Sequence, residues 1–168
     1  MLSEKLINEL NEQIKFEMYS SNLYLSMAAY CFSNDLDGFG NFFVVQAEEE
    51  KFHAMKFFNF INDMDGDIKM MAIEDPTREY SSILDVFNVA LQHERGVTAR
   101  IYHLMDLSME EREHATISFL KWFIDEQVEE ESTFKTLVTK IKRAANDDNL
   151  LYTLDSELAT RTFTPPAQ

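Results

Sequence analysis

The chain contains few of the residues that interrupt helices or cross-link chains. Its 168 residues include four Gly, three Pro and one Cys. Neither Gly nor Pro occurs between Val97 and Thr164, which favours long uninterrupted helices. The lone Cys31 excludes an intrachain disulfide framework and is typical of a reducing compartment. No apolar run approaches the ~20 residues of a membrane span, and the first residues lack a signal-peptide core, so we expect a cytoplasmic protein without a membrane partner.

Positive charge is also scarce. Fifteen Lys and Arg stand against 30 Asp and Glu, and the formal net charge is −15. Binding to nucleic acid requires clustered basic residues, so a nucleic-acid partner is excluded, whereas cations are suitable ligands. At 168 residues and 45% hydrophobic composition, the chain is expected to form a single domain, residues 1–168, with a substantial core.

Apolar residues recur at helical spacing through most of the chain and predict an all-α fold. The expected helices span residues 3–32, 39–63, 82–107, 108–145 and 147–160, the first four forming a bundle over residues 3–145. Ser82 and Ser108 each begin a capping-box pattern, which predicts the starts of the third and fourth helices. Residues 66–81 are too many for a tight turn, so we expect a long crossover loop that makes helices two and three parallel.

The short fifth helix carries a leucine stripe. Leu150, Leu151, Leu154 and Leu158 lie along one side of it. A helix of about a dozen residues is marginal in water, so the stripe must pack on something. Two partners are consistent with it: the chain's own bundle, or the same helix in other copies.

Two polar signatures repeat with the same internal spacing. Glu17 is followed by Glu50 after 33 positions and by His53 after 36. Glu94 is followed by Gln127 and Glu130 after the same intervals, 77 positions further along the chain. The repeat places these side chains on four different helices, with apolar residues around them. Carboxylates that enter a core need a compensating partner, and no matching basic residues accompany these, so the pattern predicts a two-metal site.

The chemistry of these side chains restricts the metal. Glu50 and His53 are three residues apart and share one helix face, so they can bind one ion while the second carboxylate oxygen reaches another. Hard oxygen ligands with one imidazole suit iron or manganese; Zn²⁺ is an alternative without a redox role.

Together these motifs resemble the ferritins, and specifically the bacterial non-haem ferritins, over nearly the whole chain. The residues that carry the resemblance are Glu17, Tyr24, Glu50, His53, Glu94, Gln127 and Glu130. The resemblance implies a ferroxidase centre that binds two iron ions per chain. Glu17, Glu50 and His53 would bind the first iron, and Glu50, Glu94 and Glu130 the second, with Glu50 as the bridge. Gln127 would be a weak ligand or a hydrogen-bonding neighbour.

The resemblance also implies roles for four further residues. Tyr24 would hydrogen-bond near the centre and donate an electron. Glu49, Glu126 and Glu129 match the carboxylates that, together with Glu130, hold a third iron in bacterial non-haem ferritins. From the residues alone, a solvated acidic face is an alternative explanation for Glu126 and Glu129.

No haem is expected, because two features of the haem-binding bacterioferritins are missing. The haem-ligating Met of those proteins is replaced by Lys51, and a second Glu-x-x-His is replaced by Gln127 and Glu130.

The expected function is therefore iron storage and detoxification: oxidation of Fe(II) to Fe(III) with O₂ or H₂O₂, and mineral deposition inside a shell of 24 copies. The main alternative is a di-iron oxidoreductase acting on an organic or peroxide substrate, although such enzymes usually carry a second Glu-x-x-His. A DNA-protecting mini-ferritin would lack the fifth helix, and a purely structural bundle would leave the repeated polar pattern unexplained.

Overall fold

The computed structural model describes residues 2–165, and within this range it contains helices and no strand. The helices are α1 (Glu4–Ser33), α2 (Asp37–Asp63), α3 (Ile83–Glu110), α4 (His114–Ala144) and α5 (Asp148–Leu158). The predicted all-α bundle with a short fifth helix is confirmed. Residues 161–165 are irregular, and residues 166–168 lie outside the described range. Across residues 2–165, every helix is too short or too polar to cross a membrane.

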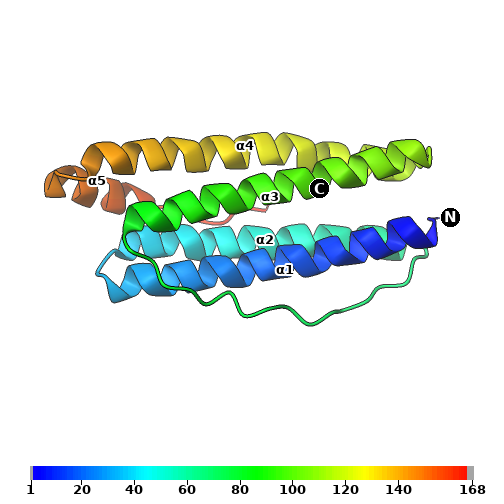
Figure 1. The fold of residues 1–168 in the computed structure, drawn as a ribbon, viewed down its shortest axis with the longest axis horizontal. Coiled ribbons are helices and arrows are strands. Elements are labelled where there is room, and N and C mark those ends of the chain that lie inside the picture. The colour runs from blue at the N-terminus through cyan, green and yellow to red at the C-terminus, as the bar shows by residue number, and fades with distance from the viewer. Residues whose placement is uncertain (1, 166–168) are drawn as a thin grey trace.

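The four long helices pack as two antiparallel pairs joined by the long loop. α1 packs along α2 and α3 along α4, and the connection from α2 to α3 runs the length of the bundle (Figure 1). The loop is attached to α1 on its way. Asn11 Nδ2 donates to the Asp67 carbonyl at 2.9 Å and Asn11 Oδ1 accepts from the Lys69 amide at 2.7 Å. Further along, Lys15 pairs with Glu74 at 3.0 Å. The crossover makes α2 and α3 parallel. The middles of all four long helices therefore lie at the same height along the bundle axis (Figure 1).

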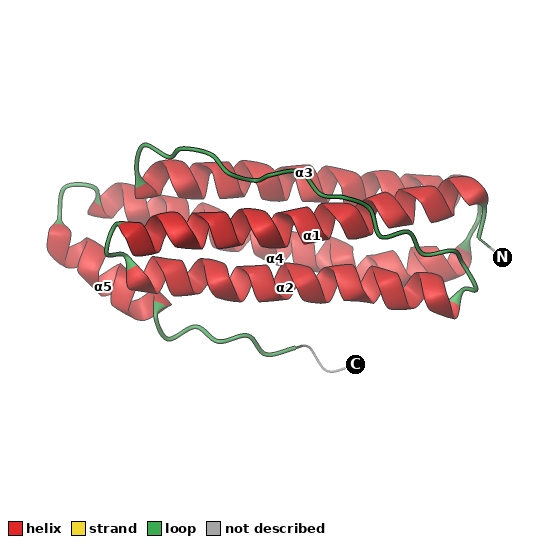
Figure 2. Ribbon diagram, turned by 90° about the horizontal axis from the view of Figure 1, so that it is seen from below, coloured by secondary structure: helices red, strands yellow, loops and turns green. Residues whose placement is uncertain are grey.

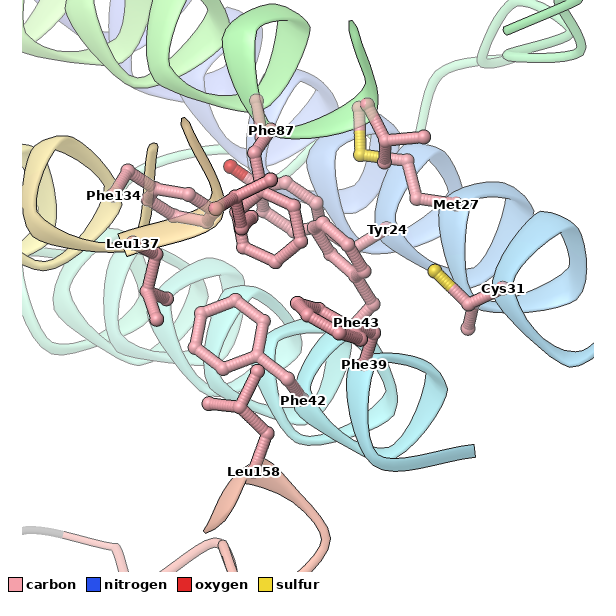
Figure 3. Close-up of a cluster of buried hydrophobic side chains, with 14 of the residues drawn as sticks. Tyr24, Met27, Cys31, Phe39, Phe42, Phe43, Phe87, Phe134, Leu137 and Leu158 are labelled. Carbon is pink, nitrogen blue, oxygen red and sulfur yellow. The ribbon is translucent and has the colours of Figure 1, made fainter. Parts of the chain in front are cut away.

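Two apolar clusters fill the bundle, one toward each end. The cluster nearer α5 consists largely of aromatic rings, and Figure 3 shows those of Phe42, Phe43, Phe87 and Phe134 grouped around one point. Phe134 is fully buried and lies 5.6 Å from Phe42 and 6.2 Å from Phe87, measured between ring centroids. The second cluster lies around Phe57 and Phe123, whose rings stack at 4.3 Å. Because apolar packing closes both ends, the polar side chains of the middle are enclosed.

The fifth helix packs on its own bundle. Leu154 and Leu158 are buried, and Leu158 points toward Phe42 (Figure 3). The approach to α2 is so close that a Cβ on Gly38 would lie 1.7 Å from the Asp155 carbonyl oxygen, so only glycine fits there. Leu150, however, is 50% exposed, so part of the leucine stripe is left uncovered by the chain's own bundle.

The predicted start of the fourth helix at Ser108 is wrong. α3 continues to Glu110, and α4 begins at His114 with Glu113 as its N-cap. Ser108 is buried inside α3, where its hydroxyl donates to the Leu104 carbonyl at 2.7 Å instead of capping a new helix. The chain turns at Arg112, whose φ of 55° ends the helix. Ser82, in contrast, caps α3 as expected by accepting from the Asp85 amide at 3.1 Å.

We predict that Glu113→Ala destabilises the folded chain by about 1 kcal/mol, the usual cost of losing an N-cap. The Glu113 side chain accepts from the Thr116 amide at 2.7 Å, and this bond would be lost. The free energy of unfolding from denaturant titration measures the effect. Glu110→Ala removes the same charge one turn earlier and is the matched control. Equal free energies for the two variants would contradict the assignment of the cap.

Candidate metal centre

Six polar side chains project from the middles of the four long helices into the bundle. They are Glu17 from α1, Glu50 and His53 from α2, Glu94 from α3, and Gln127 and Glu130 from α4. Their exposed fractions run from 0% for Glu17 to 5% for Glu130. The structure therefore places all six of these predicted residues in the interior. Four carboxylates at this depth carry a large desolvation penalty unless protons or cations neutralise them.

Glu17, Glu50 and His53 form the tightest group. One ligand atom of each lies within 4.8 Å of the others, which is close enough for all three to hold a single ion. His53 Nδ1 lies 3.5 Å from Glu50 Oε2, because residues three apart share a helix face. Glu17 Oε2 is buried and has no hydrogen-bond partner within residues 2–165. An unpartnered carboxylate oxygen beside an imidazole fits a metal ion better than it fits a closed polar network.

Glu94 is held by neutral donors from two other helices. The Tyr24 hydroxyl donates to Glu94 Oε1, and Gln127 Nε2 donates to Glu94 Oε2 at 3.1 Å. Tyr24 is itself fixed between Phe43 and Phe134, with both ring centroids at 5.8 Å. The structure thus places Tyr24 against the α3 carboxylate and not against Glu17, with which it shares a face of α1.

Glu130 lies beside Glu50, and Gln46, for which the sequence predicted no role, connects them. Gln46 is fully buried, and its Nε2 donates to Glu130 Oε2 at 2.8 Å and to Glu50 Oε1 at 3.5 Å. Gln13 plays the same part on α1 and donates to Glu17 Oε1 at 2.8 Å. The sequence spacing could have indicated both contacts, because Gln13 precedes Glu17 and Gln46 precedes Glu50 by four residues, about one helical turn.

Burial raises the carboxyl pKa values. Loss of hydration, reinforced by the Glu50 charge, raises the pKa of Glu17 from 4.5 to about 8. Burial also raises the pKa of Glu94 to about 7. The pKa of Glu130 is raised to about 8, first by burial and then by the charge of Glu94. The pKa of Glu50 lies well above its ordinary value, from burial and then from Glu94 and Glu130. The donors that reach these carboxylates are neutral, so protons compensate the charge unless cations do.

The environment is different for the three acids predicted to hold a third iron, Glu49, Glu126 and Glu129. Glu129 is exposed and Glu126 is half-buried. Burial raises the pKa of Glu126, His53 opposes that rise, and the charges of Glu129 and Glu49 add to it. Glu49 pairs with Arg161 at 2.7 Å between Oε2 and Nη2. The structure therefore does not gather these acids into a cluster as close as the inner one, and it supplies Glu49 with a cation from the chain itself.

The comparisons with known proteins agree with this geometry. A family model described as a ferritin-like domain matches residues 7–144. A bacterial non-heme ferritin of Staphylococcus aureus is 44% identical over 163 residues, which cover 97% of this chain and 98% of that protein. The corresponding protein of Staphylococcus saprophyticus is 45% identical with the same coverage. The chain belongs to the ferritin family.

The solved structures extend the agreement to the fold. An open pore ferritin from the archaeon Archaeoglobus fulgidus superposes with a TM-score of 0.95 at 43% identity, covering 96% of this chain and 100% of that one. A humanized archaeal ferritin gives a TM-score of 0.97 at 44% identity, with 98% and 100% covered. Membership in the ferritin family, together with the carboxylate–histidine cluster, supports iron storage as the general function.

Proposed function

We propose that each chain oxidises Fe(II) to Fe(III) at a two-ion ferroxidase centre and deposits the ferric product inside a hollow shell of 24 copies in the cytoplasm. The observation that carries the proposal is the enclosed set of four carboxylates and one imidazole, reached by neutral donors and left with an unpartnered oxygen on Glu17. A buried set with this much potential negative charge is best balanced by cations.

In this proposal Glu50 bridges the two ions. The first Fe(II) binds to Glu17, His53 and one Glu50 oxygen, and the second binds to Glu94, Glu130 and the other Glu50 oxygen. Gln127 already donates to Glu94, so it holds that carboxylate in place and leaves its own carbonyl oxygen available as a weak ligand. Gln13 and Gln46 orient the remaining carboxylates in the same way.

The electron balance requires two ions. Each Fe(II) gives up one electron, so a pair reduces one O₂ to H₂O₂ with two protons, or one H₂O₂ to two waters with two further protons. Anionic oxygen ligands favour Fe(III) over Fe(II) and so promote the electron loss. Binding of iron displaces the carboxyl protons, and water bound to Fe(III) becomes acidic and hydrolyses, which starts the mineral. The hydrogen bond from Tyr24 to Glu94 supports a role for Tyr24 as the donor of an additional electron to the centre.

The walls of the centre suit a small oxidant. Trp122 lies 5.4 Å and Phe123 5.8 Å from the His53 ring, edge-on in both cases, while Phe43 and Phe134 enclose Tyr24. Closely packed aromatic rings around His53 and Tyr24 restrict the room for a bulky group at this position. This arrangement favours ferroxidation over oxidation of a bulky organic substrate.

The exterior is consistent with assembly. Leu150 and Tyr152 on α5 are 50% and 74% exposed, so this helix can contact further copies. The net charge of −15 per chain would concentrate Fe(II) around and within a shell. Glu49, Glu126 and Glu129 would receive a third iron beside Glu130.

The proposal is tested by adding Fe(II) aerobically to metal-free protein, followed by size-exclusion chromatography with simultaneous detection of protein and ferric absorbance. We expect ferric iron to co-elute with a large assembly at many tens of ions per chain. Iron that stops at about two ions per chain on a small species would contradict storage and would indicate a di-iron oxidoreductase.

A further inference from the structure

The segment that follows α5 turns back and runs along α2 (Figure 2). Asn41 Nδ2 donates to the Leu158 carbonyl at 3.1 Å and to the Arg161 carbonyl at 2.9 Å. Two residues later, the ring of Phe163 meets Phe52 edge-on at 6.0 Å. Residues 159–163 are therefore held along α2 at several points, from Asn41 to Phe52.

Arg161 is the only basic residue of this segment, and its guanidinium makes several contacts with α2. Nη2 donates to Glu49 Oε2 at 2.7 Å, Nη1 donates to Gln46 Oε1 at 2.9 Å, and the group lies 4.4 Å above the Phe42 ring. Its side chain is 25% exposed and that of Glu49 23%, so the ion pair is largely shielded from solvent. A charge-assisted bond in such a position is stronger than an exposed surface pair.

The contact with Gln46 extends into the centre. Because Gln46 Oε1 accepts from Arg161, its amide nitrogen must face Glu130 and Glu50. The same arrangement occurs on the other side of the bundle, where Arg100 Nε donates to Gln13 Oε1 at 3.0 Å and Gln13 donates to Glu17. Each chain of contacts runs from arginine to glutamine to glutamate. Of these two arginines, Arg161 alone also pairs with an acid outside the inner cluster within residues 2–165.

We propose that Arg161 is an internal cation that competes with a metal ion for Glu49 and holds Gln46 in the orientation that positions Glu130. This inference rests on the proposed function, because it concerns access of a third ion to the same centre. While residues 159–163 lie along α2, the guanidinium neutralises Glu49 and the third ion binds weakly. Displacement of Arg161 frees Glu49 and strengthens that binding.

The test is titration of metal-free protein with Mn²⁺ under anaerobic conditions, with free Mn²⁺ counted by electron paramagnetic resonance. Mn²⁺ takes carboxylate ligands without requiring oxidation. For Arg161→Gln we expect the dissociation constant of the third ion to fall about tenfold, a typical coupling for one shielded charge pair. Asn41→Ala, which loosens the segment without removing the charge, should lower it in the same direction by a smaller factor.

Two controls separate competition from general effects. Arg143→Gln removes the same charge from an exposed position at the end of α4 and should leave the third constant unchanged. Adding Glu49→Gln to Arg161→Gln should abolish the gain, because the freed carboxylate is then absent. A third constant that is equal in wild type and Arg161→Gln, or that falls equally in Arg143→Gln, would overturn the inference. Failure of the proposed function is distinct: the wild-type chain would then lack the two tighter Mn²⁺ ions.

Discussion

Glu50→Gln is expected to lower the initial rate of Fe(II) oxidation by at least about 100-fold. Changing residues that only orient metal ligands already lowers metal affinity or activity about 10- to 100-fold, and in the proposed centre Glu50 would contact both ions directly. The amide keeps the size of the side chain but loses the negative charge and one anionic oxygen, so it cannot bridge two cations. Stopped-flow absorbance at two Fe(II) ions per chain measures the rate, and Mn²⁺ titration measures how many ions remain bound.

The matched control is Glu48→Gln, which makes the same change on α2 at an exposed position and should oxidise Fe(II) at the wild-type rate. A second readout guards against simple misfolding. Because Glu50 is buried with a strongly raised pKa, its replacement by a neutral amide should leave the metal-free protein at least as stable as wild type at pH 8. A well-folded Glu50→Gln protein that oxidises iron at the normal rate would remove Glu50 from the centre.

Metal-free protein is expected to lose stability as the pH rises from about 6.5 to 8.5. Glu17, Glu94 and Glu130 have folded pKa values of about 8, 7 and 8 against an ordinary 4.5, so between these limits the folded chain binds more protons than the unfolded chain. Stability then falls with rising pH. For one carboxyl shifted from 4.5 to about 8, the loss summed over that whole pH interval is on the order of 5 kcal/mol at 1.36 kcal/mol per unit, and only the part above pH 6.5 falls in this window.

Below about pH 6.5, His93 opposes the loss of stability that the carboxyls cause. Its burial lowers its pKa from 6.5 to about 4, so between these values the unfolded chain binds the extra proton and stability rises with pH. The two effects oppose each other below about pH 6.5, and above it only the carboxyl contribution remains. Denaturant midpoints measured in chelator at intervals from pH 5 to 8.5 give the profile.

Bound metal should reverse the pH dependence of stability above about pH 6.5. A cation competes with the carboxyl protons, so it binds more tightly as those protons leave. With excess Mn²⁺ the denaturant midpoint should rise from pH 6.5 to 8, and Glu17→Gln should flatten the metal-free profile. If metal-free protein instead became more stable over this range, the carboxylates would be compensated by a group other than protons.

Much of the inner site was predictable from the residues because it depends on helical spacing. Glu50 and His53 share a face at any position in a helix, and the repeated interval of 33 and 36 positions places Glu17 and Glu94 opposite their partners once the helices pair. Gln13 and Gln46 were missed even though each stands one turn before its glutamate. A buried amide has no property in the sequence that distinguishes it from a solvated one.

The break between α3 and α4 shows where local signals mislead. Ser108 opens a good capping box, yet it lies within α3 because the preceding Leu104 and Leu107 are buried in the second core cluster and the helix continues past them. Capping contributes about 1 kcal/mol, whereas burying each leucine contributes about 2 kcal/mol, so the packing decides where the helix ends.

By itself, the sequence determined the helical class, the crossover that makes α2 and α3 parallel, and the set of side chains that enter the bundle, because periodicity and loop length are properties of the chain alone. Only the tertiary structure decided which donor serves which carboxylate: Tyr24 on Glu94, Gln46 on Glu130, and Arg161 on Glu49. These partners are 70, 84 and 112 residues apart. No local pattern encodes such contacts, since they arise only when helix packing brings separate faces together.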